Sequence, residues 1–381
     1  MKSKYELSIS ANYVPDWGIV EGFREIFQNA LDNASTNPKN KMGFNFNEDA
    51  GEVAISNKTS ILEIESLLLG LTTKAGDKGT IGKHGEGYKL GFIALLRAGK
   101  TVKVYNYGKK EIWTAKLVKS KRYNGSIIPV VTVEKQAFWK SVPDSDLTVV
   151  VGNITTEDYA SLIVKNLHLR HSIEAFEVPN MGNILTAENE RGNIYVRGLF
   201  VCNHEEMTYG YDFEPELIEL DRDRKLVRTF DITWNTSAMW RYAYGKDFMR
   251  KEVLEMIKDA KKDVQYFKDR MHTVNKVKED AAVEESIADE LAKDFQKEFG
   301  YHSYPVMDNK EMSIVQEKST SKTVMVNPVV AKYIRSAPNV KVMRIPDEIP
   351  LKQQFQELLD DIEGKLLEEE VDRFSQLIMK L

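Results

Sequence analysis

Apolar and polar positions follow two different periods along the chain, and these predict a mixture of helices and strands. Over residues 17–35, apolar side chains recur at the spacing of one face of an α-helix. Residues 147–151 and 193–201 form short runs rich in β-branched side chains, as strands do. The pattern therefore predicts an α+β fold, with a sheet and helices in the first part of the chain.

The length and the changes of pattern divide the chain into three predicted domains. Its 381 residues suffice for two or three hydrophobic cores. We predict an α/β sandwich over 5–153, a second α/β domain over 154–245 and a mainly helical region over 246–381. Within the last region, residues 322–345 predict a small strand, helix, strand unit, followed by a final helix after residue 351.

Residues 253–274 show a 3.5-residue repeat. The apolar positions are spaced four and three apart: Val253, Ile257, Ala260, Val264, Phe267, Met271 and Val274. This repeat predicts a long helix with a narrow seam. The seam would pack on the chain's own domain or on a second copy in a homodimer.

Composition narrows the class of protein. There are 53 Lys and Arg against 58 Asp and Glu, a net charge of −5, which does not favour a surface that coats nucleic acid throughout. The single cysteine, Cys202, cannot form an internal disulfide, and this fits a reducing compartment. No window is apolar enough for a membrane span. We therefore expect a cytoplasmic protein that does not bind membranes.

The predicted helix over 17–35 has a polar face as well as an apolar one. Glu25, Asn29 and Asp32 fall within about 60° of one another on the side opposite the apolar residues. Such a stripe is typical of a solvated surface, and it is also what a ligand site on a helix requires. The helix alone leaves both interpretations open.

A glycine-rich segment follows. Gly82, Gly85 and Gly87 precede an apolar helical run over 90–96, an arrangement that lets backbone N–H groups approach an anion at a helix N-terminus. The spacing matches neither a P-loop, since His84 follows Gly82-Lys83, nor the dinucleotide fingerprint. A phosphate site of another kind is the natural inference.

Taken in order, these segments resemble the GHKL ATPase superfamily. The matching residues are Glu25-x-x-x-Asn29-x-x-Asp32, the segment 69–76, the loop 81–88 and the strand 147–151. That superfamily includes the gyrase B subunit, the ninety-kilodalton heat-shock chaperones, MutL proteins and sensor histidine kinases. The resemblance covers residues 15–152 and implies ATP and Mg²⁺ as cofactors.

The resemblance also implies roles for individual residues. Glu25 matches the general base that activates the attacking water, Asn29 the ligand of Mg²⁺, and Asp32 an acid lining the pocket. Further nucleotide contacts would come from the loop, its neighbours and the strand hydroxyl: Lys74, Gly82, His84, Gly85, Gly87, Lys89 and Thr148.

One motif departs from the family. The family places Asp-x-Gly-x-Gly after a strand, with the aspartate accepting from the adenine amino group, whereas this chain has Asn57, Thr59 and Ile61 at those positions. An asparagine carbonyl can still accept that hydrogen bond. Base specificity therefore stays open.

Beyond the first domain, the basic turn with Arg222, Arg224 and Lys225 lies where related proteins bring a γ-phosphate sensor. These features together predict a Mg²⁺-dependent, slowly hydrolysing ATP switch that acts on a protein partner or client. Two alternatives stay open: a nucleotide-dependent binding module with negligible hydrolysis, and an ATP-gated clamp on nucleic acid that would use the basic stretch 100–122.

Overall fold

The computed structural model describes residues 2–37, 39–69, 87–136, 146–220, 228–268, 277–318 and 321–342, together with positions 359, 371 and 374. The chain divides into two compact units, Met1–Ala243 and Tyr244–Leu381. Each combines helices with a sheet, so the predicted α+β class is confirmed. The three predicted domains, 5–153, 154–245 and 246–381, stay a prediction.

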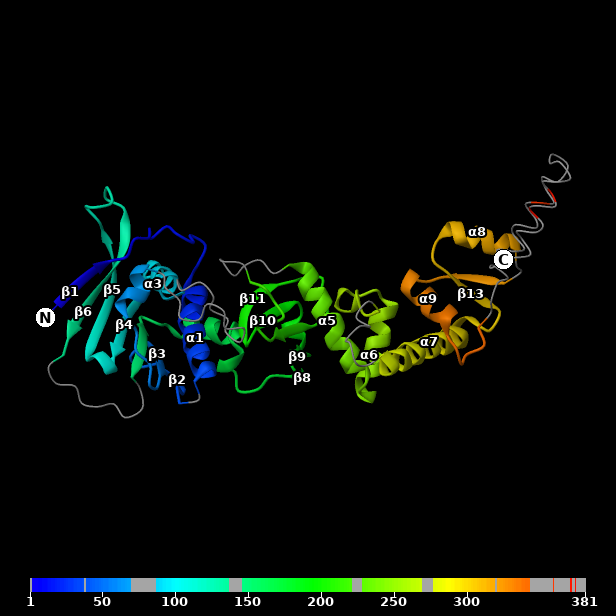
Figure 1. Ribbon diagram of the computed structural model, residues 1–381, viewed down its shortest axis with the longest axis horizontal. Helices are drawn as coiled ribbons and strands as arrows, with labels where there is room; N and C mark the ends of the chain where they lie inside the picture. The colour runs from blue at the N-terminus through cyan, green and yellow to red at the C-terminus, as the bar shows by residue number, and fades with distance from the viewer. Residues whose placement is uncertain are drawn as a thin grey trace. The chain divides into compact units, whose positions relative to one another are not determined.

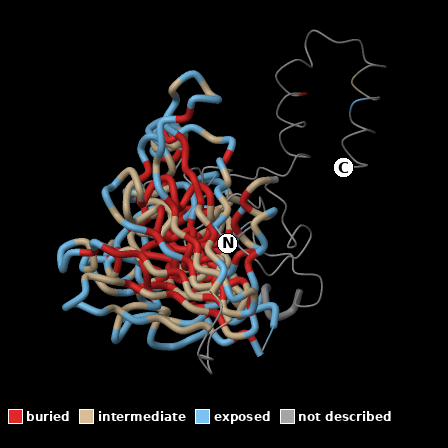
Figure 2. Tube along the Cα trace, turned by 90° about the vertical axis from the view of Figure 1, so that its left-hand side faces the viewer, coloured by how far each residue is buried: buried red, intermediate tan, exposed pale blue. Residues whose placement is uncertain are grey.

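A large antiparallel sheet opens the first unit. Its described strands run in the order β1-β6-β5-β4-β7-β3-β2. The strands are β1 (Lys2–Glu6), β2 (Met42–Asn47), β3 (Glu52–Asn57), β4 (Thr101–Asn106), β5 (Glu111–Lys119), β6 (Ile127–Lys135) and β7 (Leu147–Gly152). Alternate residues along the central strands are buried, as a sheet covered on one face requires. Buried positions run through the interior of this unit, which faces the viewer in Figure 2.

Helices α1 (Ile19–Thr36) and α3 (Gly87–Arg97) pack against this sheet and against each other (Figure 1). The short helix α2 (Ile64–Leu69) lies between β3 and α3 in the sequence. The crossing of α1 and α3 depends on two glycines. A Cβ on Gly91 would lie 2.9 Å from the carbonyl oxygen of Gly22, and a Cβ on Gly22 would lie 2.8 Å from Leu95 Cγ. Only glycine allows the two backbones to approach this closely.

The loop before α1 is held by one side chain at the end of α3. The Arg97 guanidinium donates to the carbonyl oxygens of Ala11 at 2.9 Å, Val14 at 2.8 Å and Trp17 at 2.6 Å. These charge-assisted bonds fix the chain where it enters α1.

A second, smaller sheet follows in the same unit, with described strands in the order β11-β10-β12-β9-β8. Its elements are α4 (Thr156–Val164), β8 (Ala175–Val178), β9 (Gly182–Leu185), β10 (Asn193–Val196), β11 (Leu199–Asn203), β12 (Gly210–Phe213) and α5 (Thr229–Tyr244). The Trp240 indole N–H on α5 donates to the Tyr211 hydroxyl on β12 at 2.7 Å. The helix is thereby fixed to the sheet.

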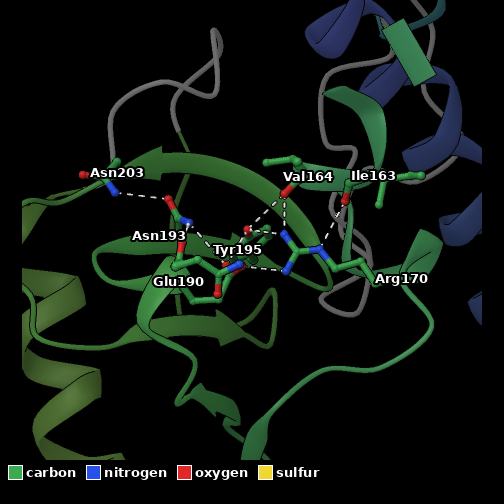
Figure 3. Close-up of polar contacts among 8 residues, drawn as sticks. Ile163, Val164, Arg170, Glu190, Asn193, Tyr195 and Asn203 are labelled. Atoms are coloured by element: carbon green, nitrogen blue, oxygen red, sulfur yellow. Dashed lines mark hydrogen bonds and ion pairs between the residues drawn. The ribbon is translucent and has the colours of Figure 1, made fainter. Parts of the chain in front are cut away.

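A partly buried ion pair joins the end of α4 to this second sheet (Figure 3). Arg170 contacts a carboxylate oxygen of Glu190 at 2.7 Å and donates to the Tyr195 hydroxyl at 2.9 Å and to the carbonyl oxygens of Ile163 and Val164. The Tyr195 hydroxyl in turn donates to Glu190 at 2.7 Å. Burial and the hydrogen bond to Glu190 raise the pKa of Tyr195. The end of α4 is therefore tied to β10 by a fully hydrogen-bonded network.

The strand-like residues predicted over 193–201 do lie in strands, and only the continuity of the run is wrong. β10 and β11 form a hairpin instead, because Arg197 and Gly198 turn the chain with φ angles of 47° and 74°. Both residues lie in the left-handed region that two-residue hairpin turns use.

The second unit contains α6 (Asp247–Lys258), α7 (Val277–Phe299), β13 (Ser303–Val306), α8 (Asn309–Lys318), β14 (Lys322–Met325) and α9 (Pro328–Ser336). The strand and helix predicted over 322–336 are confirmed by β14 and α9. β14 pairs in parallel with β13, and residues 339–342 form no strand. The predicted final helix lies almost wholly outside the described residues.

The continuous helix predicted over 253–274 is also wrong. α6 ends at Lys258, where Ala260 takes a left-handed φ of 52°. The N–H of Lys261 then donates to Met256 O at 3.0 Å, and that of Ala260 to Ile257 O at 3.2 Å, which is a Schellman termination. The apolar residues on either side of this turn are buried within the second unit itself: Val253, Ile257, Val264 and Phe267.

Candidate functional site

The polar face of α1 is buried. Glu25 is 1% exposed and Asp32 is 0% exposed, while Asn29 is partly exposed. Burying a carboxylate is costly unless ions or hydrogen bonds compensate. A guanidinium nitrogen of Arg24 lies 3.6 Å from Glu25, and one of Arg197 lies 3.8 Å from Asp32. The solvated-face interpretation therefore does not hold for the two acids.

The glycine crossing brings α3 beside Glu25. A Cβ on Gly91 would lie 3.2 Å from Glu25 Cβ, so the two helices touch at this carboxylate. α3 begins at Gly87, and Lys89, in its first turn, is 8% exposed. The positive end of the α3 dipole and a buried lysine thus lie on the helix that contacts Glu25.

Asn29 presents its carbonyl oxygen away from α1. Its amide nitrogen donates to the backbone carbonyl of Glu25 at 2.7 Å. Since a carbonyl oxygen can only accept, this bond fixes the orientation of the amide and leaves Oδ1 on the other side. An amide oxygen is a ligand that suits Mg²⁺, with phosphates and waters completing the octahedron. The residue present therefore fits the metal that the sequence implies.

Asn57 is oriented in the same way. It is 2% exposed at the end of β3, and its amide nitrogen donates to Ala30 O of α1 at 3.0 Å. The acceptor Oδ1 then faces away from α1. An aspartate at this position would place a carboxylate against the Ala30 carbonyl. The neighbouring backbone carbonyl thus favours an asparagine over an aspartate here, and the side chain still offers a hydrogen-bond acceptor.

Thr148 does not lie with Asn57. In the sheet register Asn57 pairs with Leu147, whereas Thr148 pairs with Ser56 and with Tyr105. Paired residues share a face, so Thr148 projects from the face opposite α1. There it hydrogen-bonds with the Tyr107 side chain. Burial and the neighbouring Tyr105 raise the pKa of Tyr107, although the bond with Thr148 lowers it.

α1 also contacts the second sheet. Besides the Arg197 contact with Asp32, the guanidinium of Arg24 donates to Phe200 O of β11 at 3.5 Å, and the rings of Phe27 and His168 lie 5.7 Å apart. The helix that carries the polar face is therefore packed against both sheets of the first unit.

Several predicted site residues lie outside the described part of the chain. Residues 70–86 contain Lys74, Gly82, His84 and Gly85, and residues 221–227 contain Arg222, Arg224 and Lys225. Their assignments stay predictions.

The basic stretch 100–122 is partly neutralised. Lys100 forms an ion pair with Asp158, and Lys109 forms one with Glu63. Other lysines of the stretch are exposed. The two pairs reduce the charge that this stretch can offer to a phosphate backbone.

The sequence patterns did not single out Arg197 or Gly91. Gly91 stands inside a helical apolar run, where an unexpected glycine is itself a signal of close backbone packing. Arg197 has no local signal, because its role depends on the hairpin that brings it to α1.

Two absences among the described residues concern metal cofactors and membranes. No three side chains of His, Cys, Asp or Glu converge there as a metal cage would require. Over the same ranges, every helix is too short or too polar to traverse a bilayer.

No protein-family model and no curated protein matches the chain. Among solved structures, it is similar to the ATPase region of Saccharomyces cerevisiae topoisomerase II, with a TM-score of 0.30 and 12% identity, over 59% of this chain and 83% of that one. It is also similar to the ATPase and transducer domains of DNA topoisomerase II from Balamuthia mandrillaris, with a TM-score of 0.30 and 11% identity, over 59% and 82% of the two chains. Both of these neighbours are ATPase regions.

Proposed function

We propose that the first unit binds ATP with Mg²⁺, hydrolyses it slowly and acts as a conformational switch on a protein partner. The observation that carries the proposal is the buried polar face of α1. Glu25 and Asp32 are retained as buried acids on a helix whose apolar face already packs on the sheet. Such groups are costly in a purely structural helix, and they are typical of a site.

Each described residue has a chemical role in this proposal. Asn29 Oδ1 would hold Mg²⁺, which when bound neutralises charge on the phosphates. Asn57 Oδ1 accepts from the base. Glu25 accepts the proton of a water whose oxygen attacks the γ-phosphorus, and ADP leaves.

The switch requires that nucleotide change the contacts of α1. The contacts of Asp32 with Arg197 and of Arg24 with Phe200 link this helix to the second sheet. ATP shifts the equilibrium only by the difference in its affinity for the two forms. Arg222, Arg224 and Lys225 are proposed as the γ-phosphate sensor of the closed form.

The test is nucleotide binding and phosphate release by the full chain, by Glu25→Gln and by the control Glu21→Gln. Glu21 lies one turn earlier on α1 and accepts from the Gly18 N–H at 2.8 Å, a bond that glutamine keeps. We expect Glu25→Gln to bind ATP and to lose about 100-fold or more of its hydrolysis, and Glu21→Gln to keep its rate. Equal rates in the three proteins would exclude Glu25 as the base. Binding without phosphate release would favour the binding module.

A further inference from the structure

The second unit contains a groove between the end of α6, the turn over 259–268 and the start of α9. Its volume is about 300 Å³. Asn327, the N-cap of α9, holds the two walls together, because its amide nitrogen donates to the carbonyl oxygens of Ile257 at 2.8 Å and of Lys258 at 2.7 Å. The walls of the groove are therefore fixed by the fold of this unit.

The floor of the groove is apolar. Ile257, Val264, Phe267 and Tyr333 line it, and each is at most 6% exposed. Val329, in the first turn of α9, also lines it and is 45% exposed. An apolar side chain that covers this surface is removed from water together with it, which favours binding.

The charged residues that line the groove are all basic among those the structure describes. They are Lys261, Lys268 and Lys332, and no aspartate or glutamate accompanies them. Lys261 lies 3.6 Å from Asp259, whereas neither Lys268 nor Lys332 forms an ion pair within the described part of the chain. The ammonium of Lys268 lies 5.3 Å from the centroid of the Tyr333 ring. In a chain with a net charge of −5, the groove is therefore a local site of positive charge.

The floor and the lysines together define the chemistry of an occupant. The three ammonium groups stand on two separate elements, the turn over 259–268 and α9, so one small anion cannot neutralise all of them. An occupant with several spaced carboxylates and an apolar face complements both features. A concave groove also favours side chains that project from a helix over a flat membrane surface.

We propose that this groove docks an acidic amphipathic peptide segment of a partner protein. An apolar side chain of the segment lies on the floor, and its carboxylates face Lys261, Lys268 and Lys332. The inference goes beyond the proposed function, because it gives the second unit a binding site and states the chemistry of the partner. It requires no nucleotide.

The experiment measures binding of labelled synthetic peptides to the full chain by fluorescence anisotropy. The test peptide has about 18 residues, with leucine at the spacing of one helix face and glutamate elsewhere. One control peptide has lysine in place of glutamate, and another is polyglutamate of the same length. We expect the test peptide to bind about tenfold or more tightly than either control, and its affinity to fall as NaCl is raised.

Two variants alter the groove without disturbing its floor. Lys332→Glu reverses a charge on the exposed side of α9, and Val329→Asp places an acid in the first turn of that helix. Both substitutions suit a helix at these positions, so both proteins should fold. We expect the test peptide to bind about fivefold more weakly to Lys332→Glu and about tenfold more weakly to Val329→Asp.

Lys310→Glu is the matched control. Lys310 is exposed in the first turn of α8, in the same unit, and it does not line the groove. The variant makes the same change of charge as Lys332→Glu. We expect it to bind the test peptide as wild type does.

The outcomes decide between occupants. Binding that falls in both groove variants and not in Lys310→Glu supports the proposal. A wild-type chain that binds no test peptide overturns it, whether the groove is empty or filled by the chain itself. Equal binding of polyglutamate, or equal affinity in wild type and both groove variants, overturns it as well.

Two further measurements test the other occupants. Light scattering that shows a wild-type dimer and a Lys332→Glu monomer would assign the groove to a second copy and overturn the proposal. Binding to phosphatidylserine vesicles without binding to the test peptide would assign it to a lipid surface, with the same consequence. A failure of the chain to bind ATP overturns only the proposed function, since the peptide experiment contains no nucleotide.

Discussion

An aspartate in place of Asn57 should destabilise this protein. In Asn57→Asp, the bond of 3.0 Å from the amide nitrogen to Ala30 O is lost, and a carboxylate oxygen faces that carbonyl in a position 2% exposed. The lost hydrogen bond contributes about 1 kcal/mol, and the new carboxylate, buried against a carbonyl oxygen that offers no proton, costs about 1–3 kcal/mol more. We therefore expect a loss of about 2–4 kcal/mol in the free energy of unfolding at pH 7, or about 5–15 °C in Tm.

The loss should depend on pH in a defined direction. Burial against a carbonyl raises the pKa of the new carboxyl above its unfolded value of about 3.9. Between the two pKa values, the folded state keeps a proton that the unfolded state has released. The loss of unfolding free energy relative to wild type is therefore complete above the folded pKa and shrinks as the pH falls toward about 4. Below that pH, the protonated carboxyl donates to Ala30 O and restores the bond.

Urea unfolding between pH 4.5 and 8, followed by tryptophan fluorescence, measures this effect. All five tryptophans lie at or before Trp240, so the signal reports on the first unit alone. Asn47→Asp is the control, because Asn47 is exposed and only accepts, from the Ala50 N–H at 3.1 Å. A substitution of this kind should stay within about 0.5 kcal/mol of wild type. An Asn57→Asp protein as stable as wild type at pH 7, or a deficit that does not change with pH, would refute the reasoning.

Three further outcomes can be checked by unfolding. Gly91→Ala places a Cβ 2.9 Å from a backbone carbonyl of α1 and should cost about 1–3 kcal/mol, measured in urea. Glu190→Gln leaves the partly buried Arg170 without its carboxylate and should cost about 1.5–3 kcal/mol, whereas replacing both residues with apolar ones should recover part of the loss. Burial tends to raise the pKa of Asp158, but bonds from Lys100 and a backbone N–H hold it below its usual value. Its contribution to stability is therefore present above about pH 4 and is lost as the pH falls further. Asp158→Asn should flatten that acid limb of the stability curve.

The spacing of apolar residues correctly predicted the helices and strands whose sequences follow a regular period. The helix over 17–35 was found at Ile19–Thr36, and the valine-rich run over 147–151 was found as β7. The two failures share one cause. Arg197 and Ala260 adopt positive φ, a conformation that glycine and asparagine signal and that arginine and alanine do not. At Ala260 the two Schellman bonds compensate for the strain, and at Arg197 the contact with Asp32 does so. Hydrophobic periodicity records neither of them.

The site could be predicted only in part, for a similar reason. The spacing of Glu25, Asn29 and Asp32 placed them on one face of a helix, but whether that face is buried depends on the elements that cover it. That Thr148 lies on the sheet face opposite α1 could not be predicted, because the side of a strand that faces a helix follows from its pairing.

Asn29, Asn57 and Asn106 obey one local rule. Each donates its amide N–H to a backbone carbonyl, at 2.7, 3.0 and 2.7 Å respectively. A carboxylate at any of the three positions would face that carbonyl without a proton to donate. Asparagine satisfies the backbone and still presents an oxygen, without introducing a negative charge. The departure from an aspartate motif is therefore compatible with recognition of an amino group.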